Sequence, residues 1–152
     1  MNHAALTVGS LAGHWNRLGI ALHFVGRVEP FASFRSVDLV NTLNAQIERE
    51  HCLFALEGRR VVGYLGWACY DAAVAEPFAH GGGPPPNTLA QGRDVAWILT
   101  AAAIQQSALM PMVRALRARF PGMRVMGVRH KPQARGTRRV VFDRAPRLQP
   151  GQ

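Results

Sequence analysis

The chain has 152 residues, of which 48% are hydrophobic and 18% are charged, so it is long and apolar enough for one folded domain, which excludes a disordered or fibrous chain. Its formal net charge is +9, and Lys131 is the only lysine among the 18 basic residues. A basic surface attracts acidic partners, which include nucleic acid, anionic lipid and acidic carrier proteins.

The composition also indicates a compartment. Cys52 and Cys69 fall in predicted strands without metal-ligand spacing, so we expect buried, unreacted thiols in a reducing environment. The first twelve residues lack the basic start and apolar run of a signal peptide. The apolar segment 95–113 is interrupted by polar residues and by Pro111, which favours a buried strand followed by a helix over a membrane span. We therefore expect a cytoplasmic protein with no membrane span.

Two helices are predicted in the N-terminal third of the chain. Residues 4–18 form the first, and residues 19–34 are predicted to be irregular. Apolar residues at three- and four-residue spacing predict a clearer helix from about Ser36 to Glu50, with Ser33 or Ser36 as its N-terminal cap.

A β-hairpin follows at residues 52–70. Two β-prone runs are joined there by the turn Glu57-Gly58-Arg59-Arg60. The second run carries Gly63 and Gly66, and glycine inside a strand often marks the close approach of a ligand or another backbone. Trp67 beside them is expected either in the core or at the wall of an apolar slot.

The second half of the chain begins with a predicted surface loop, residues 71–92, in which three glycines precede three prolines. This loop is either a lid or a tolerated insertion. A strand from Asp94 through Leu99, a helix at 107–119 and a strand at 124–128 then predict a parallel crossover unit. A last strand is expected at 138–142.

Helices, a hairpin and then a strand–helix–strand unit is the element order of the GNAT-like acyltransferase fold. Several short runs within that order resemble the RTX-toxin-activating lysine acyltransferases, the hemolysin-activator family. The runs are Asn41-Thr42-Leu43, Val62-Gly63-Tyr64 with Trp67-Ala68 and Asp71-Ala72, the basic run from Arg114 to Pro121, and Val128-Arg129 with Val140-Val141-Phe142. The resemblance implies an α+β, GNAT-like fold with a mixed central sheet, N-terminal helices and a βαβ C-terminal half. We expect one domain at residues 1–144 and a tail at 145–152.

Members of that family move a fatty acyl chain from acyl carrier protein to a lysine ε-amine of a partner protein in the cytoplasm. The run Ala21-Leu22-His23 is similar to the family's Pro-Leu-His, which implies that His23 is the general base. The family's aspartate on the central strand is replaced here by Thr100, and Asp94 is an acid on the same predicted strand. The chain is therefore either a divergent member with an altered substrate or mechanism, or a relative that has lost activity. His51 is the second candidate base.

The resemblance further implies an acyl-carrier site. Its residues are Gly63, Gly66 and Trp67 beside the acyl chain, with Arg114, Arg117 and Arg129 facing the acidic carrier. The plainer interpretation of these arginines is a solvated helix face. The resemblance implies no bound cofactor, no metal, acyl-ACP or acyl-CoA as co-substrate, and a protein or peptide acceptor; a homodimer is left open.

Two other functions are weighed against this one. An ordinary acyl-CoA-dependent GNAT enzyme needs a glycine-rich turn that wraps the pyrophosphate at the start of the central helix. The sequence there is Gln105-Gln106-Ser107-Ala108, which favours a carrier-protein donor. A basic nucleic-acid-binding module fits the charge, but the sequence has no helix-turn-helix, aromatic RNA platform or zinc pattern, so we expect no nucleic-acid partner.

Overall fold

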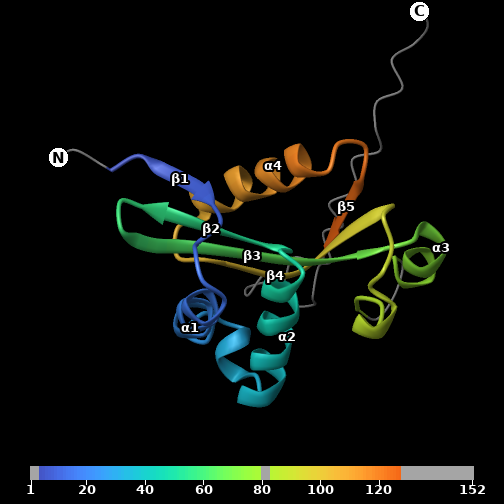
Figure 1. Ribbon diagram of the computed structural model, residues 1–152, viewed down its shortest axis with the longest axis horizontal. Helices are drawn as coiled ribbons and strands as arrows, with labels where there is room; N and C mark the ends of the chain where they lie inside the picture. The colour runs from blue at the N-terminus through green and yellow to red at the C-terminus, as the bar shows by residue number, and fades with distance from the viewer. Residues whose placement is uncertain (1–3, 80–82, 128–152) are drawn as a thin grey trace, which may run out of the picture. The chain divides into compact units, whose positions relative to one another are not determined.

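The computed structural model describes residues 4–79 and 83–127, whose helices and strands are labelled in Figure 1. The strands are β1 (Leu6–Gly9), β2 (Cys52–Glu57), β3 (Arg60–Tyr70), β4 (Val95–Ala103) and β5 (Arg124–Gly127). The α-helices are α1 (His14–Val25), α2 (Ser36–Glu48), α3 (Ala72–Ala75) and α4 (Leu109–Arg119). Short 3₁₀ turns are η1 (Phe31–Ser33), η2 (Glu76–Phe78), η3 (Asn87–Leu89) and η4 (Gln106–Ala108). The predicted strand at 138–142, the tail from 145 and the candidate Arg129 lie outside the described residues.

The chain divides into two compact units. Among the described residues, the first comprises 4–67 and 100–119, and the second comprises 68–79, 83–99 and 120–127. The order of strands is β1-β2-β3-β4-β5, and β3 and β4 contribute residues to both units. The single domain at residues 1–144 stays a prediction.

The predicted hairpin is confirmed. Strands β2 and β3 pair antiparallel, with Cys52 opposite Gly66 and Glu57 opposite Arg60. Gly58 in the connecting turn has φ 62°, a conformation that glycine adopts without steric cost. The parallel crossover is confirmed as well, because β4 pairs in parallel with β5 from Val95↔Arg124 onward and α4 connects them.

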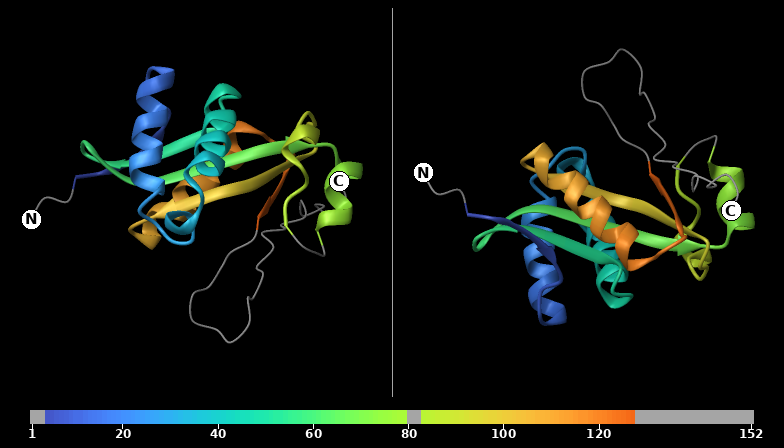
Figure 2. Two further views of the ribbon diagram at one scale, coloured as in Figure 1. Left: turned by 90° about the horizontal axis from the view of Figure 1, so that it is seen from below. Right: turned by 90° about the horizontal axis from the view of Figure 1, so that it is seen from above.

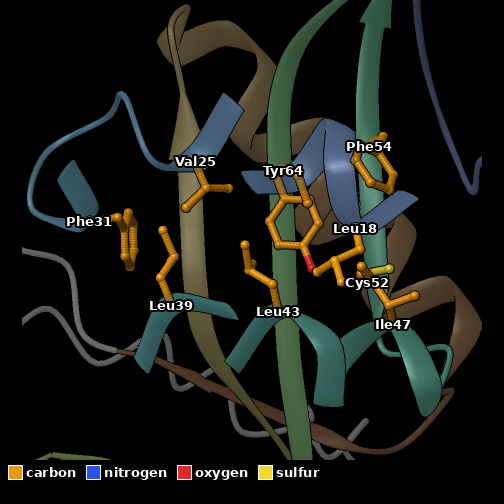
Figure 3. Packing of buried hydrophobic residues seen from close by; sticks show 11 residues of the cluster. Leu18, Val25, Phe31, Leu39, Leu43, Ile47, Cys52, Phe54 and Tyr64 are labelled. Carbon is orange, nitrogen blue, oxygen red and sulfur yellow. The ribbon is translucent and has the colours of Figure 1, made fainter. Parts of the chain in front are cut away.

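Helices cover both faces of the strands of the first unit. In Figures 1 and 2, α1 and α2 lie on one face and α4 lies on the other. The buried stripe of α2 includes Leu39, Leu43 and Ile47. Leu43 and Ile47 belong to the predicted apolar spacing, whereas Val37 at its start is 51% exposed. The buried side chains pack with Phe54 and Tyr64 (Figure 3). The two rings lie edge to face, with their centroids 5.1 Å apart. On the opposite face, α4 buries Met112, Val113 and Leu116.

The prediction of a helix at residues 4–18 is wrong at its start. Residues 6–9 form an edge strand that pairs antiparallel with β2, Thr7 opposite Leu56. The helix begins only at His14, after Gly13 with φ 79°, and it continues through Val25, which was predicted to be irregular. Extending the helix lets Leu18, Ala21 and Val25 bury one continuous stripe.

The predicted serine cap of α2 is also wrong. Arg35 occupies the N-cap position without a capping side-chain hydrogen bond, and Ser36 is already helical. The Ser33 hydroxyl instead donates to the Glu29 carboxylate, 3.0 Å away. Asp38 stabilises the helix start, because its negative charge in the first turn complements the helix dipole.

The second unit has a small core of its own around Tyr70, Val95, Trp97 and Met126. The segment predicted as a surface loop, 71–92, contains α3, η2 and η3 in its described part. The Tyr70 hydroxyl donates to the carbonyl of Pro85 at 3.0 Å and so ties this segment to the end of β3. Among the described residues, no helix has the length and apolar character needed to cross a membrane.

Candidate active site

Thr100 of β4 belongs to a buried polar network on the α1–α2 face. Gln46 Nε2 donates to Thr100 Oγ1 at 3.0 Å, and the Tyr64 hydroxyl donates to Gln46 Oε1 at 2.9 Å. All three residues are almost fully buried, and burial raises the pKa of Tyr64, so its hydroxyl stays protonated and can donate. The network is therefore neutral at the position where the family resemblance expects an aspartate.

Gly66 is required by this network. A Cβ atom at position 66 would overlap the side-chain amide of Gln46, which lies directly over the strand there. The glycine thus lets Gln46 reach both Thr100 and Tyr64. The space beside Gly66 is occupied by this side chain.

Gly63 lets a side chain of α4 approach the opposite face of the same strand. A Cβ there would lie 2.7 Å from Met112 Cε of α4 and 3.2 Å from Ala55 Cβ. Met112 therefore packs directly against the backbone of β3. The close approaches that the two glycines predicted are real, and side chains of this chain make them.

His23, the predicted base, lies in the last turn of α1. Its neighbours two residues away on either side, Ala21 and Val25, are fully buried, whereas His23 is exposed. Two residues correspond to about 200° around a helix, so the ring projects from the outer side of α1. Among the hydrogen bonds of the described residues, none joins His23 to Thr100.

Asp94 lies in the second unit, just before β4. Its Oδ2 accepts a hydrogen bond from the backbone N–H of Ala72 at 2.8 Å, at the start of α3. Its own backbone N–H donates to the carbonyl of Tyr70, 3.1 Å away. These contacts give Asp94 a role in holding the chain after β3.

Trp67 packs with two side chains from other elements of the first unit. The His51 ring is stacked on the indole, with centroids 5.8 Å apart and planes 22° apart. The guanidinium of Arg119 at the end of α4 lies 5.8 Å from the same indole. Burial, and then the charges of Arg49 and Arg119, lower the pKa of His51, so its imidazole is neutral at pH 7. Trp67 itself is fully buried.

Helix α2 ends in a Schellman motif, in which Glu50 stands where glycine is usual. The His51 N–H donates to the Gln46 carbonyl at 2.8 Å, and the Glu50 N–H donates to the Ile47 carbonyl at 3.1 Å. Glu50 has φ 56°, in the left-handed region where glycine is usual at this position. Its carboxylate takes two hydrogen bonds from Arg17 of α1, at 2.7 and 2.8 Å. This pairing lowers the pKa of Glu50.

The predicted carrier-binding arginines that the structure describes lie on α4. Arg114 and Arg119 are exposed and Arg117 is half-buried, and residues 109–119 contain no acid.

Helix α4 is preceded by the 3₁₀ turn η4, in which the Ala108 N–H donates to the Gln105 carbonyl at 3.0 Å. Pro111 in the first turn of α4 has no N–H. The helix start therefore offers few backbone donors to a pyrophosphate.

Other reactive groups are accounted for in the part of the chain that the structure covers. Cys52 and Cys69 are buried, as predicted, and no disulfide joins them. Burial raises the pKa of the Cys52 thiol, so it is not a thiolate nucleophile. No cluster of three or more His, Cys, Asp or Glu side chains suited to a metal ion occurs within residues 4–79 and 83–127.

Comparison with known proteins gives a likeness of fold. No family profile matches the chain, and no curated protein sequence matches it. Among solved structures, the GphF GNAT-like decarboxylase in complex with isobutyryl-CoA aligns with a TM-score of 0.58 and 17% identity, covering 84% of this chain and 67% of that one. An N-acetyltransferase from Staphylococcus aureus Mu50 aligns at a TM-score of 0.46 and 12% identity, over 80% of each chain. An aminoglycoside acetyltransferase, meta-AAC0020, from an uncultured soil metagenomic sample aligns at 0.44 and 17%, over 83% of this chain and 78% of that one. The likeness to GphF confirms the predicted α+β, GNAT-like fold.

Proposed function

We propose that this chain is a GNAT-like acyltransferase that moves an acyl group from a thioester carrier to an amine. The observation that carries the proposal is the fold, which the chain shares over most of its length with a GNAT-like protein whose structure holds isobutyryl-CoA. Fold alone does not define a reaction. The donor, the acceptor and the base are therefore argued from individual residues.

The proposed donor is acyl carrier protein. A CoA donor brings a pyrophosphate that needs several backbone N–H groups at the start of α4. Pro111 removes one of these, and the turn before the helix has no glycine. An acidic carrier protein instead suits a basic helix face, and Arg114, Arg117 and Arg119 lie along α4 with no acid among them. Acyl-CoA is the alternative donor.

The proposed acceptor is a lysine-type amine of a protein or ribosomal peptide, with His23 as the base. A lysine amine has a reference pKa near 10.4, so it must lose a proton before it attacks the thioester carbonyl. The amine nitrogen forms the new amide bond, the imidazole takes the proton, and the carrier thiol leaves. The exposure of His23 suits an acceptor that is itself a macromolecule.

The test is a transfer assay with acyl-ACP and acyl-CoA as donors and lysine-bearing peptides or the products of neighbouring genes as acceptors, with mass spectrometry as the readout. We expect a mass gain from acyl-ACP that falls by about 10²–10⁴-fold in His23→Ala. His14→Ala is the matched control, since it removes another α1 histidine. Transfer from acyl-CoA alone would favour the alternative donor, and equal rates in both variants would refute His23 as the base.

A second candidate reaction is decarboxylation of a β-carboxyacyl thioester. The structural relative GphF is described as a decarboxylase. Loss of CO₂ from a β-carboxyacyl thioester that is unaffected in His23→Ala would select this reaction over amine acylation.

The setting of the reaction is part of the same proposal. We infer a cytoplasmic enzyme, since acyl-ACP is made there, and light scattering will decide whether it is a homodimer. Salt-sensitive oligonucleotide binding without acyl transfer would instead favour the nucleic-acid-binding alternative.

A further inference from the structure

Helix α1 carries a large exposed side chain on the side that faces away from the strands. Trp15 is 79% exposed, more than any other large hydrophobic side chain of the described residues. Gly19 and His23, one and two turns further along the helix, are exposed as well. Residues four apart form a ridge on a helix surface, and we call Trp15, Gly19 and His23 the α1 ridge. It lies opposite the buried stripe with which α1 packs on the strands beside α2 (Figure 2).

Gly19 leaves a gap in the middle of the α1 ridge. Glycine inside a helix is destabilising relative to alanine, so its presence there calls for a reason. A Cβ atom at Gly19 would meet no atom within 4 Å, whereas at Gly63 and Gly66 it would overlap another side chain. Packing within one copy of the chain therefore does not require this glycine. On an exposed ridge, it lets the backbone of a second helix come close.

The α1 ridge is complementary to itself in the antiparallel direction. Trp15 and His23 lie four residues before and four residues after Gly19. A two-fold axis at Gly19 therefore places Trp15 of one copy against His23 of a second copy, and the symmetry repeats the same contact. The indole and the imidazole are flat rings that pack favourably on each other. The two helices then cross at Gly19, where no side chain keeps them apart.

Charge does not oppose this contact, although the chain as a whole has a net charge of +9. Residues 4–28 contain no acid and only two arginines. Arg17 is buried and paired with Glu50, and Arg27 lies eight residues beyond Gly19. The two-fold axis keeps the two copies of Arg27 roughly 24 Å apart, well beyond the screening length of roughly 8 Å at physiological ionic strength.

The surface that the contact buries is enough for a weak dimer. Two indoles bury roughly 300–400 Å² between them, a large share of the roughly 1,200 Å² at which stable specific interfaces begin. The remaining area comes from the two helix surfaces around Gly19. We therefore expect a dimer that dissociates on dilution.

We propose that the α1 ridge binds a second copy of this chain about a two-fold axis at Gly19, and that Trp15 of the second copy completes the site around His23. On its own copy, His23 projects from the outer side of α1 and is exposed. The indole from the second copy adds an apolar wall beside the imidazole, against which the methylene groups of an acceptor lysine pack. The dimer does not depend on acyl transfer, whereas the role of Trp15 beside the base rests on the proposed function.

The first experiment measures assembly of the full chain by light scattering over a range of concentrations. We expect a concentration-dependent dimer that Trp15→Ala weakens by about thirtyfold. Gly19→Gln should abolish the dimer while leaving the single chain folded, because it replaces an exposed helical glycine by a better helix former. Met110→Ala is the control, since it removes a 42% exposed side chain from α4, on the other face of the strands.

A cross-link locates the axis. Gly19→Cys should give a disulfide-linked dimer under mild oxidation, because the axis brings the two copies of residue 19 within bonding distance. Ala118→Cys, at an exposed position of α4, is the matched control and should stay unlinked. A chain that is monomeric at every concentration, or a dimer that persists unchanged in both Trp15→Ala and Gly19→Gln, overturns the interface.

The second experiment tests Trp15 at the site of the other copy. We expect Trp15→Ala to lower acyl transfer by at least about tenfold. Mixing Trp15→Ala with His23→Ala should then restore up to about a quarter of the natural activity, since half of the dimers hold one copy of each and have one complete site. A natural dimer that is active and shows no recovery on mixing overturns this role of Trp15. A dimer through Gly19 without any acyl transfer supports the interface and counts against the proposed function alone.

Discussion

Arg17 of α1 and Glu50 after α2 are joined by two hydrogen bonds of 2.7 and 2.8 Å, although Glu50 adopts a backbone conformation that favours glycine. The pair fixes the point where α2 turns into β2. The exposed part of the pair belongs to Glu50 and the buried part to Arg17, so replacing the carboxylate leaves a buried guanidinium without its counter-ion.

Replacing Glu50 by glycine and by alanine should give different stabilities. Both changes remove the ion pair, but glycine adopts φ 56° without steric cost and alanine does not. We expect Glu50→Gly to be about 1 kcal/mol more stable than Glu50→Ala. Urea unfolding of the two variants measures this difference, and equal midpoints would show that the left-handed backbone is not kept.

The same pair predicts a loss of stability in acid. Its partner lowers the pKa of Glu50, so the pair stabilises the fold above the unfolded-state pKa, near 4.3, and this contribution disappears as the pH falls through the lower folded-state pKa. We expect the stability gap between the natural chain and Glu50→Gln to be constant near neutral pH and to shrink below about pH 4.3. A gap that does not change with pH would contradict this linkage.

His51 should add a second pH dependence at higher pH. Its pKa is lowered in the folded chain, so between about 6.5 and the folded-state value the unfolded chain binds more protons. Stability therefore falls as the pH drops through this window and levels off below it. We expect the unfolding free energy of His51→Gln to depend less on pH than that of the natural chain below about pH 6.5. His23→Gln, which changes an exposed histidine, is the control.

The stability effects of three glycine-to-alanine changes should depend on which atoms the new Cβ contacts. Gly66→Ala displaces Gln46 and breaks its hydrogen bonds, for which we expect a loss of about 2–4 kcal/mol. Gly63→Ala meets the flexible end of Met112, so a loss of about 1–2 kcal/mol is expected. Gly19→Ala has open space on α1 and should stabilise by about 0.5–1 kcal/mol. Thermal unfolding checks this order. If Gly66→Ala left the stability unchanged, the Gln46 side chain could not lie over β3 as described.

Thr100→Val tests the buried network directly. Valine keeps the shape of threonine but leaves Gln46 Nε2 without its acceptor. We expect a loss of about 1–2 kcal/mol for the unsatisfied donor. The double change Thr100→Val with Gln46→Leu should lose less than the sum of the single changes, and strict additivity in this cycle would mean that the two side chains do not interact.

Most of the fold follows from local patterns. The spacing of Leu43 and Ile47 and the hairpin turn at Gly58 each identified an element that the structure contains. The N-terminal strand was missed because Leu6 was grouped with Leu11, Trp15 and Leu18 as one side of a helix, whereas residues 6–9 form an edge strand. Pairing with β2, a contact distant in sequence, decides between the two.

The site was harder to predict, since its contacts join residues far apart in the chain. Gln46 was overlooked, although it lies three residues after Leu43 on the buried stripe of α2, where a polar residue calls for a partner. The glycines of β3 correctly predicted close approach. Their spacing did not reveal that Gln46 and Met112, rather than a ligand, make it.

The three tryptophans differ in surroundings in a way that gives the molecule built-in optical reporters. Trp15 is 79% exposed, whereas Trp67 of the first unit and Trp97 of the second are 0% and 3% exposed. Fluorescence of chains that retain only Trp67 or only Trp97 will therefore follow the melting of each unit separately. Coincident curves would make the chain one cooperative block, and separate curves would make it two.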